Sequence, residues 1–133
     1  MEPKMQYIST RGGGEPVASA VAIKTGLAPD GGLFIPESLP AMGLAETAAA
    51  AGRGYQELAG KILGSFLSDF SAAELRSMVE KAYGDNFDTP EIAPVHVPGD
   101  KMGFLELWHG PTCAFKDLAL QALPHLLKAS VEK

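Results

Sequence analysis

A lysine at the start of a predicted helix is the residue of this chain best placed for covalent chemistry. Lys116 follows a polar loop, residues 109–115, whose sequence is HGPTCAF. Gly110 and Pro111 end the preceding strand, because glycine permits strained angles and proline cannot continue a sheet ladder. Thr112 is predicted to cap the helix that follows. The positive end of the helix dipole disfavours a lysine there, which indicates a use for its amine.

Two interpretations of Lys116 remain open from its neighbours alone. Lysines become nucleophiles and Schiff-base formers when an apolar setting lowers their pKa, and Ala114 and Phe115 could supply that setting. The alternative is a solvated surface lysine, the usual state of this residue type. Cys113 lies in the same loop, where a helix N-terminus could activate its thiol, but we expect it to be a small buried packing residue.

The composition limits the classes of function open to the chain. Its 133 residues, 46% of them hydrophobic, suffice for one domain with a proper core. Eleven basic and 16 acidic residues give a net charge of −5, so nucleic acids and anionic membranes are not expected partners. The single cysteine excludes an internal disulfide and favours a reducing, cytoplasmic setting. No apolar run approaches the length of a membrane span or a signal peptide core.

The first third of the chain predicts two short strands around one helix. The strands are expected over residues 5–9 and 33–35, where β-forming side chains are bounded by breakers. Between them, a helix is expected to begin at Pro16 and to end before Gly26. Val21 is assigned to the inner face of this helix.

Other candidate chemical groups are better explained as turn and surface residues. The glycines at 12–14 lack the Gly-Lys-Ser/Thr of a phosphate loop, so we interpret them as a flexible connector. Asp30 lies between a proline and two glycines and is interpreted as turn chemistry, not as a catalytic carboxylate. The histidines at 96, 109 and 125 are too far apart for an H-x-x-x-H pair, and we predict no metal site.

The middle of the chain predicts an αα-hairpin. Apolar residues recur at helical spacing over residues 55–67 and again over 75–83. Ser71 and Glu74 have the spacing of a capping box at the start of the second helix. The two apolar stripes are expected to face each other, and a weaker helix is expected over residues 46–51.

The last third predicts a linker, a hairpin and a long helix. Residues 85–94 are polar and bounded by proline, which is typical of a domain boundary. Strands over residues 95–97 and 104–107 are expected to pair across a turn. The helix predicted over residues 115–131 is apolar almost all round, and Pro124 should kink it.

The lysine segment closely resembles the cofactor-lysine segment of the threonine synthase family. The similarity covers residues 105–117, LELWHGPTCAFKD. Residues 7–12 (YISTRG) and 26–36 (GLAPDGGLFIP) are similar to the amino-terminal signature of the same family. The three motifs follow the family's order and are spread over the whole chain.

The resemblance implies an α/β fold with two parts. Residues 1–84 would form the family's α+β amino-terminal domain, with short strands and an αα-hairpin. After a linker at 85–94, residues 95–133 would begin the cofactor domain of the tryptophan-synthase-β-like fold. Family members are enzymes that convert O-phospho-L-homoserine and water to L-threonine and phosphate, in a β,γ-replacement that serves threonine biosynthesis.

The resemblance also implies roles for individual residues. Lys116 would carry pyridoxal 5'-phosphate, be displaced by the substrate, and then move protons between substrate carbons. Phe115 would lie against the cofactor ring, and Thr112 would help to shape the site. This division suits the cofactor, whose conjugated ring accepts electrons while the protein positions and protonates the substrate.

Family members are much longer than this chain, so it is expected to be an amino-terminal fragment with little or no activity alone. The loops that hold the cofactor phosphate and most of the substrate pocket would lie outside it, and the apolar surface left exposed predicts self-association. Pro124 also departs from the uninterrupted helix expected there. Two alternatives stay open: a related phospho-lyase that makes no threonine, and a non-catalytic interaction or assembly domain.

Overall fold

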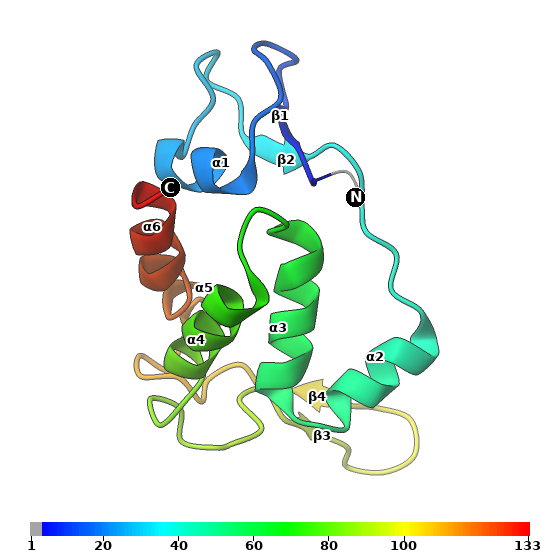
Figure 1. Cartoon of the computed structure of the whole chain (residues 1–133). Helices are drawn as coiled ribbons and strands as arrows, with labels where there is room; N and C mark the ends of the chain where they lie inside the picture. The colour runs from blue at the N-terminus through cyan, green and yellow to red at the C-terminus, as the bar shows by residue number, and fades with distance from the viewer. Residues whose placement is uncertain (1–3) are drawn as a thin grey trace.

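Two short strand pairs lie at opposite ends of a group of packed helices in the computed structural model, which describes residues 4–133 (Figure 1). This mixture of helices and small sheets confirms the predicted α/β class. The elements in chain order are β1 (Tyr7–Ser9), α1 (Ser19–Thr25), β2 (Phe34–Pro36), α2 (Leu44–Ala51), α3 (Tyr55–Phe66), α4 (Ala72–Ala82), β3 (Val95–His96), β4 (Phe104–Leu105), α5 (Asp117–Leu120) and α6 (Leu123–Val131).

The amino-terminal strands pair antiparallel, with Ile8 opposite Ile35. Tyr7 also exchanges two backbone hydrogen bonds with Val17, at 2.8 and 2.9 Å. The chain at Val17 is therefore extended, and the prediction that a helix begins at Pro16 is wrong. Tertiary pairing overrides the local preference of proline for a first helical turn.

Helix α1 begins at Ser19 because a distant carboxylate supplies its amino-terminal partner. The hydroxyl of Ser19 and the backbone N–H of Ala20 both donate to Asp69, the latter at 2.9 Å. Asp69 lies in the turn between α3 and α4, so this contact also fixes α1 on the helical hairpin. Because the helix begins later than predicted, Val21 is 36% exposed, and its assignment to the inner face is wrong. Gly26 ends the helix, as predicted, and adopts a φ of 78°.

The predicted αα-hairpin is confirmed as α3 and α4, which pack on each other, and α2 precedes them. Ser71 and Glu74 form both bonds of the predicted capping box. The N–H of Ser71 donates to the Glu74 carboxylate at 2.6 Å and lowers its pKa to about 2, with help from the Ser71 hydroxyl and from Lys133.

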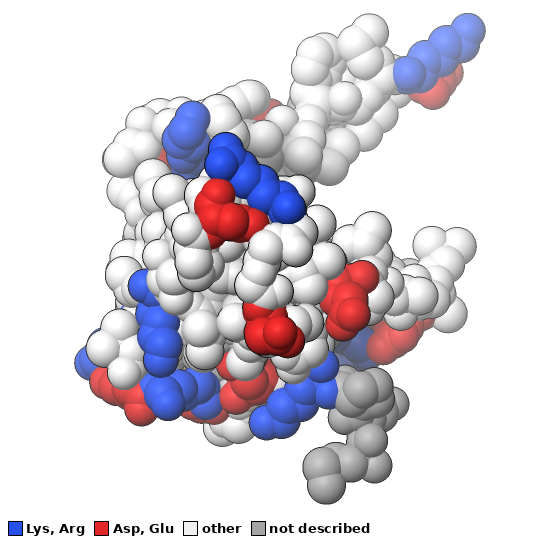
Figure 2. Space-filling model, turned by 90° about the horizontal axis from the view of Figure 1, so that it is seen from above, with Lys and Arg blue, Asp and Glu red and all other residues white. Residues whose placement is uncertain are grey.

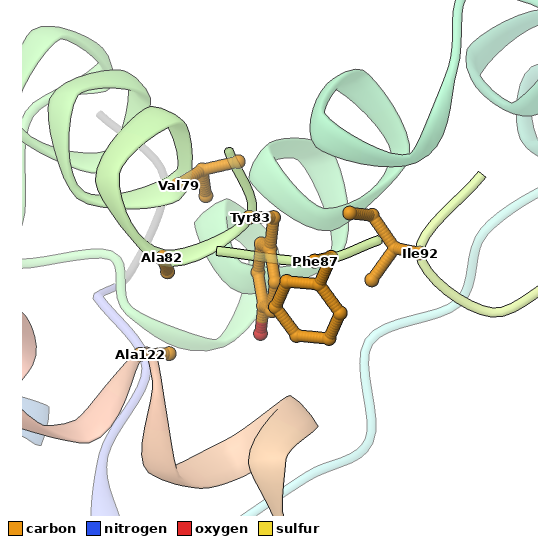
Figure 3. Close-up of a cluster of buried hydrophobic side chains, with 6 residues drawn as sticks. All are labelled: Val79, Ala82, Tyr83, Phe87, Ile92 and Ala122. Atoms are coloured by element: carbon orange, nitrogen blue, oxygen red, sulfur yellow. The ribbon is translucent and has the colours of Figure 1, made fainter. Parts of the chain in front are cut away.

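Two clusters of buried side chains make the core, and the partly buried Leu63 and Leu126 contact both. The first cluster, drawn in Figure 3, consists of Val79, Ala82, Tyr83, Phe87, Ile92 and Ala122. The second consists of Ala20, Leu67, Phe70, Leu75 and Met78. Helix α4 contributes to both clusters and is therefore the centre of the packing.

The stretch 85–94, interpreted from its sequence as a linker, carries two buried residues. Phe87 is 8% exposed and Ile92 is 2% exposed, and both belong to the first core cluster. Ile92 adopts φ 62°, an unfavourable conformation for a β-branched residue, so its burial must offset this strain. The stretch thus packs against the end of α4.

The long carboxy-terminal helix predicted over residues 115–131 is divided into α5 and α6. Pro124 lies in the first turn of α6, where its missing N–H is tolerated. The prediction of one kinked helix is therefore wrong, because the chain forms two helices at this point. Helix α6 packs on α1 and α4, and the end of the chain lies beside α1 (Figure 1).

Strands β3 and β4 form the predicted antiparallel hairpin, shortened to two residues each. His96 is exposed on this hairpin. Among the helices of residues 4–133, none combines the length and apolarity needed to cross a membrane.

Candidate functional site: the lysine loop

The lysine loop, residues 109–116, connects the segment after β4 to helix α5 and is closed by a buried carboxylate. Asp117 is only 1% exposed. Its carboxylate accepts the backbone N–H of Thr112 at 2.8 Å and the Thr112 hydroxyl at 2.9 Å. Thr112 therefore does not cap the helix, and that prediction is wrong, because its polar groups point to Asp117 instead. The residue that precedes the first helical turn is Lys116.

Gly110 allows the loop to close tightly on Asp117. A Cβ atom at Gly110 would lie 2.5 Å from the Cβ of Asp117, so only glycine fits without displacing the chain. The carbonyl of Gly110 also accepts the N–H of Cys113 at 3.0 Å. The backbone of the loop is thus fixed at both its beginning and its end.

Cys113 lies at the outer corner of this loop. Its φ of 57° is in the left-handed region, which side-chain-bearing residues seldom adopt, and its side chain is exposed. The expectation that Cys113 is a buried packing residue is therefore wrong. The left-handed turn that brings the chain back toward Asp117 leaves this corner in solvent.

Lys116 presents its amine to solvent beside one aromatic ring. The Nζ atom lies 4.4 Å from the centroid of the Phe115 ring, a cation–π distance, and both residues are exposed. Ala114 is exposed as well, so Ala114 and Phe115 do not form the apolar enclosure anticipated around the amine. Within residues 4–133, no carboxylate forms an ion pair with Lys116.

Helix α5 is held in place from the end of α4. The Tyr83 hydroxyl donates to the Leu118 carbonyl at 2.8 Å, and the Asn86 amide donates to the Gln121 side chain at 2.9 Å. Burial raises the pKa of Tyr83 to about 12, so its phenol stays protonated as a donor. The two bonds fix the helix that follows Lys116, while the loop itself is fixed by Asp117.

The other end of the loop is held by His109. Its Nδ1 lies 2.5 Å from the Asp88 carboxylate and its Nε2 lies 2.7 Å from the Glu106 carboxylate. Hydrogen bonding to Glu106, and then to Asp88, raises the pKa of His109 above its ordinary value of 6.5. The backbone N–H of Asp88 also donates to the His109 carbonyl at 3.0 Å.

A second carboxylate-centred loop lies near β1, away from the lysine. Asp30 accepts the Ser9 hydroxyl at 2.7 Å and the N–H groups of Gly13 and Gly32 at 2.9 Å each. The Ser9 bond is the main cause of a lowered Asp30 pKa. The interpretation of Asp30 as turn chemistry is confirmed, and the glycines at 12–14 are held by it rather than forming a free connector.

Sequence reasoning missed Asp117 and His109 as the residues that fix the lysine loop. A signal existed for Asp117, because a carboxylate between Lys116 and an apolar helix face is unusual and needs partners. For His109 the spacing to Glu106, three residues before it, was a weak signal, whereas Asp88 is 21 residues away in the chain.

Known proteins match this chain over most of its length. A family model described as threonine synthase N terminus matches residues 6–83. The threonine synthase of Schizosaccharomyces pombe is 38% identical over 130 residues, which cover 96% of this chain and 25% of that protein. Threonine synthase-like 1 of Homo sapiens is 45% identical over 109 residues, which cover 79% of this chain and 14% of that protein.

The solved structures agree with the sequence matches. A PLP-bound threonine synthase from Brucella melitensis superimposes with a TM-score of 0.90 at 35% identity, covering 97% of this chain and 28% of that one. The chain thus spans about a quarter of the Schizosaccharomyces pombe relative. The family model and the superposition agree with the three sequence motifs, and the chain belongs to the family of threonine synthase N-terminal sequences.

Proposed function

We propose that this chain supplies the amino-terminal domain and the cofactor lysine of a threonine synthase, which converts O-phospho-L-homoserine and water to L-threonine and phosphate. The observation that carries the proposal is an exposed lysine amine at the end of a tightly held loop. This lysine belongs to a chain that superimposes almost throughout on a PLP-bound threonine synthase.

The residues of the lysine loop fit a covalently held pyridoxal 5'-phosphate. An aldehyde cofactor needs an accessible amine, and Lys116 is exposed without an ion-pair partner in the described chain. Phe115, 62% exposed and next to that amine, offers an aromatic face for the cofactor ring. Thr112 shapes the site through its bonds to Asp117, which fix the loop.

When bound, pyridoxal phosphate supplies an electron sink for carbanions at the substrate. The contribution of this chain is to hold the reacting amine and to move protons. Lys116 Nζ is the atom we assign to both tasks, first as the attachment point and then as the base and acid at the substrate carbons. The bonds from Thr112 to Asp117 keep the backbone of Lys116 in one position during these transfers.

The proposed domain organisation follows the same alignment. Residues 1–84 are the amino-terminal domain, residues 85–94 the linker, and residues 95–133 the beginning of the cofactor domain. The family-model match over residues 6–83 supports the first boundary. Phe87 and Ile92, buried against α4, would make the linker a fixed connection.

The proposed partner is a small molecule in the cytoplasm. In Figure 2, Lys and Arg side chains lie interspersed with Asp and Glu side chains over the face shown, as expected for a protein that binds no polyanion. The net charge of −5 supports the same conclusion. The single cysteine supports a reducing compartment.

We also propose that the isolated chain self-associates through the hairpin of β3 and β4. Several large apolar side chains are about half exposed or more on and around this hairpin: Val95, Val97, Met102, Phe104 and Leu105. Large apolar side chains exposed within one short hairpin are typical of a surface that binds protein. Light scattering of the 14.0 kDa chain should show dimers or larger species, and Met102→Ser with Phe104→Ser should shift it to monomers.

The function is tested by product analysis with the purified complete enzyme that contains this chain, pyridoxal phosphate and O-phospho-L-homoserine. Threonine and phosphate should form in equal amounts. Lys116→Ala should abolish both products, while Lys101→Ala should leave the rate unchanged. Threonine formation at an undiminished rate by the Lys116→Ala variant would overturn the proposal.

The alternative is a phospho-lyase that releases phosphate from the same class of substrate without making threonine. The sequence motifs do not separate the two activities, because both would use the same cofactor lysine. The same assay separates them, since a lyase would yield 2-oxobutyrate, ammonia and phosphate with no threonine.

A further inference from the structure

One histidine joins three separate segments at the base of the lysine loop. His109 begins the loop, Asp88 belongs to the stretch between α4 and β3, and Glu106 follows β4. The two ring nitrogens lie 2.5 Å from Asp88 Oδ1 and 2.7 Å from Glu106 Oε2. The His109 side chain is 15% exposed, against 72% for Asp88 and 23% for Glu106, so the ring is the protected centre of the group.

The chemistry of these contacts fixes the protonation state of the ring. A neutral imidazole has one N–H donor and one acceptor nitrogen, whereas an ionised carboxylate can only accept. Both short contacts are hydrogen bonds at the same time only when the two ring nitrogens each carry a proton. The arrangement therefore requires an imidazolium cation between two carboxylates.

The contacts continue from His109 to the lysine along the backbone. The His109 carbonyl accepts the N–H of Asp88 at 3.0 Å, and the next residue, Gly110, lies directly against Asp117. Asp117 in turn is the first residue of α5 and adjoins Lys116. A movement of His109 would therefore be transmitted to the lysine within one short, closely packed loop.

We propose that His109 is a positioning residue, an imidazolium clamp whose two carboxylate partners hold the lysine loop against the stretch 85–94. Its relevance to catalysis rests on the proposed function of Lys116. The clamp itself depends only on His109, Asp88 and Glu106, so it can be tested separately.

The clamp predicts a definite pH dependence. The charged groups that face His109 are Asp88, Glu106 and, at longer range, Glu91, whose own pKa His109 helps to lower. Because all three are acidic, they favour the charged ring. A raised pKa means that the stabilisation is complete below the ordinary pKa of 6.5 and is lost as the pH rises through the folded-state pKa. The loop should therefore loosen on the alkaline side.

The first measurement follows the His109 ring by NMR as the pH is raised. His109 should titrate above the ordinary histidine pKa of 6.5, and the Asp88→Asn, Glu106→Gln double variant should move its midpoint back toward that value. These substitutions keep the size of each side chain. Titration of His109 at or below 6.5 in the original protein would overturn the proposal.

The second measurement tests whether the clamp holds the loop. The amide protons of Cys113 and Asp117, both bonded within the loop, should lose protection from exchange about threefold to tenfold as the pH passes the His109 midpoint. The Leu75 amide in α4 serves as the reference. The double variant should show this reduced protection throughout, so that the two proteins differ below the midpoint and agree above it. Equal protection in both proteins at all pH values would contradict the clamp.

The third measurement links the clamp to Lys116 and isolates the proposed function. Pyridoxal phosphate is added, the adduct is reduced with borohydride, and labelling of Lys116 is expressed relative to Lys101. This ratio should fall above the His109 midpoint in the original protein and stay low in the double variant. If the Lys116 to Lys101 ratio were high but did not change with the protonation of His109, the positioning role would be overturned. If Lys116 were not labelled selectively at any pH, the result would count against the proposed function of Lys116. The clamp would still be decided by the first two measurements.

Discussion

The loop around Asp30 and the loop around Asp117 are built on the same plan but differ in the residue they leave free. In each, one carboxylate accepts a hydroxyl and at least one backbone N–H group, from Ser9, Gly13 and Gly32 in the first and from Thr112 in the second. In the first loop, these hydroxyl and N–H groups bond to Asp30. In the second loop, Thr112 bonds to Asp117 in the same way, but the amine of Lys116 stays in solvent. The comparison shows that the same carboxylate-centred turn can either use all its polar groups internally or hold an amine outside its own bonds.

Alanine at Gly110 should have the largest effect of the changes that separate the two loops. The new Cβ would lie 2.5 Å from the Cβ of Asp117, which cannot move, so we expect a loss of about 3 kcal/mol in the free energy of unfolding. Gly13→Ala should cost less, because the nearest atom there is Oδ2 at the end of the Asp30 side chain. Denaturant titration measures both.

A helical glycine provides the control with the opposite sign. A Cβ at Gly60, within α3, meets nothing within 4 Å. Gly60→Ala should therefore raise the free energy of unfolding by about 0.5–1 kcal/mol, through helix propensity. If Gly110→Ala were as well tolerated as Gly60→Ala, the close packing of the lysine loop on Asp117 would be disproved.

Asparagine at Asp117 should be the next most damaging change. An amide of the same shape keeps one acceptor, but its NH₂ group opposes a donor of Thr112, so we expect a loss of about 2 kcal/mol. Selective modification of Lys116 by pyridoxal phosphate should fall as well. Asp30→Asn should leave that modification unchanged, because Asp30 is not part of the lysine loop. An equal effect of both variants on Lys116 would remove the distinction between the loops.

A glycine at Cys113 should stabilise the lysine loop slightly. Cys113 has φ 57°, which glycine adopts without strain, and its side chain is exposed, so its removal loses little packing. We expect a gain of up to about 1 kcal/mol in the free energy of unfolding. Cys113→Ala keeps the strained backbone and should be neutral. A gain from alanine equal to that from glycine would show that the side chain, not the backbone, is responsible.

The smallest effect should be the loss, in acid, of the contribution that Asp30 makes to the free energy of unfolding. The Ser9 hydroxyl, and then the Gly32 and Gly13 N–H groups, lower the Asp30 pKa below 3.8. A lowered pKa gives a stabilisation that is present above the unfolded-state value and lost as the pH falls through the folded-state value. Urea titrations of the original protein and Asp30→Asn should therefore differ above about pH 4 and converge in stronger acid. A difference that grew on acidification would contradict this sign.

The sequence was sufficient where a structure depends on near neighbours. The capping box of Ser71 and Glu74 and the apolar stripes of α3 and α4 each lie within one short segment, and each was predicted correctly. Pro124 marked an irregularity in the last helix, although the predicted kink is a break between α5 and α6. Local preferences decide such features because the competing long-range contacts are weak there.

Prediction failed where a distant residue supplies the deciding contact. Helix α1 begins at Ser19 because Tyr7 holds Val17 extended and because Asp69, 50 residues from Ser19, accepts at the helix start. In the lysine loop, the motif predicts a role for Lys116, but the contacts of Asp117 and His109 depend on how the loop folds back. No spacing rule in the sequence specifies that Thr112 will turn to Asp117.

The position of pyridoxal phosphate on the chain is the measurement that tests the account most directly. The protein is treated with the cofactor, reduced with borohydride, digested, and analysed for modified lysines by mass spectrometry. The account predicts modification of Lys116 well above that of Lys24, Lys61 and Lys101. Modification spread evenly over the four lysines, or concentrated on another one, would contradict the assignment of Lys116 as the cofactor lysine.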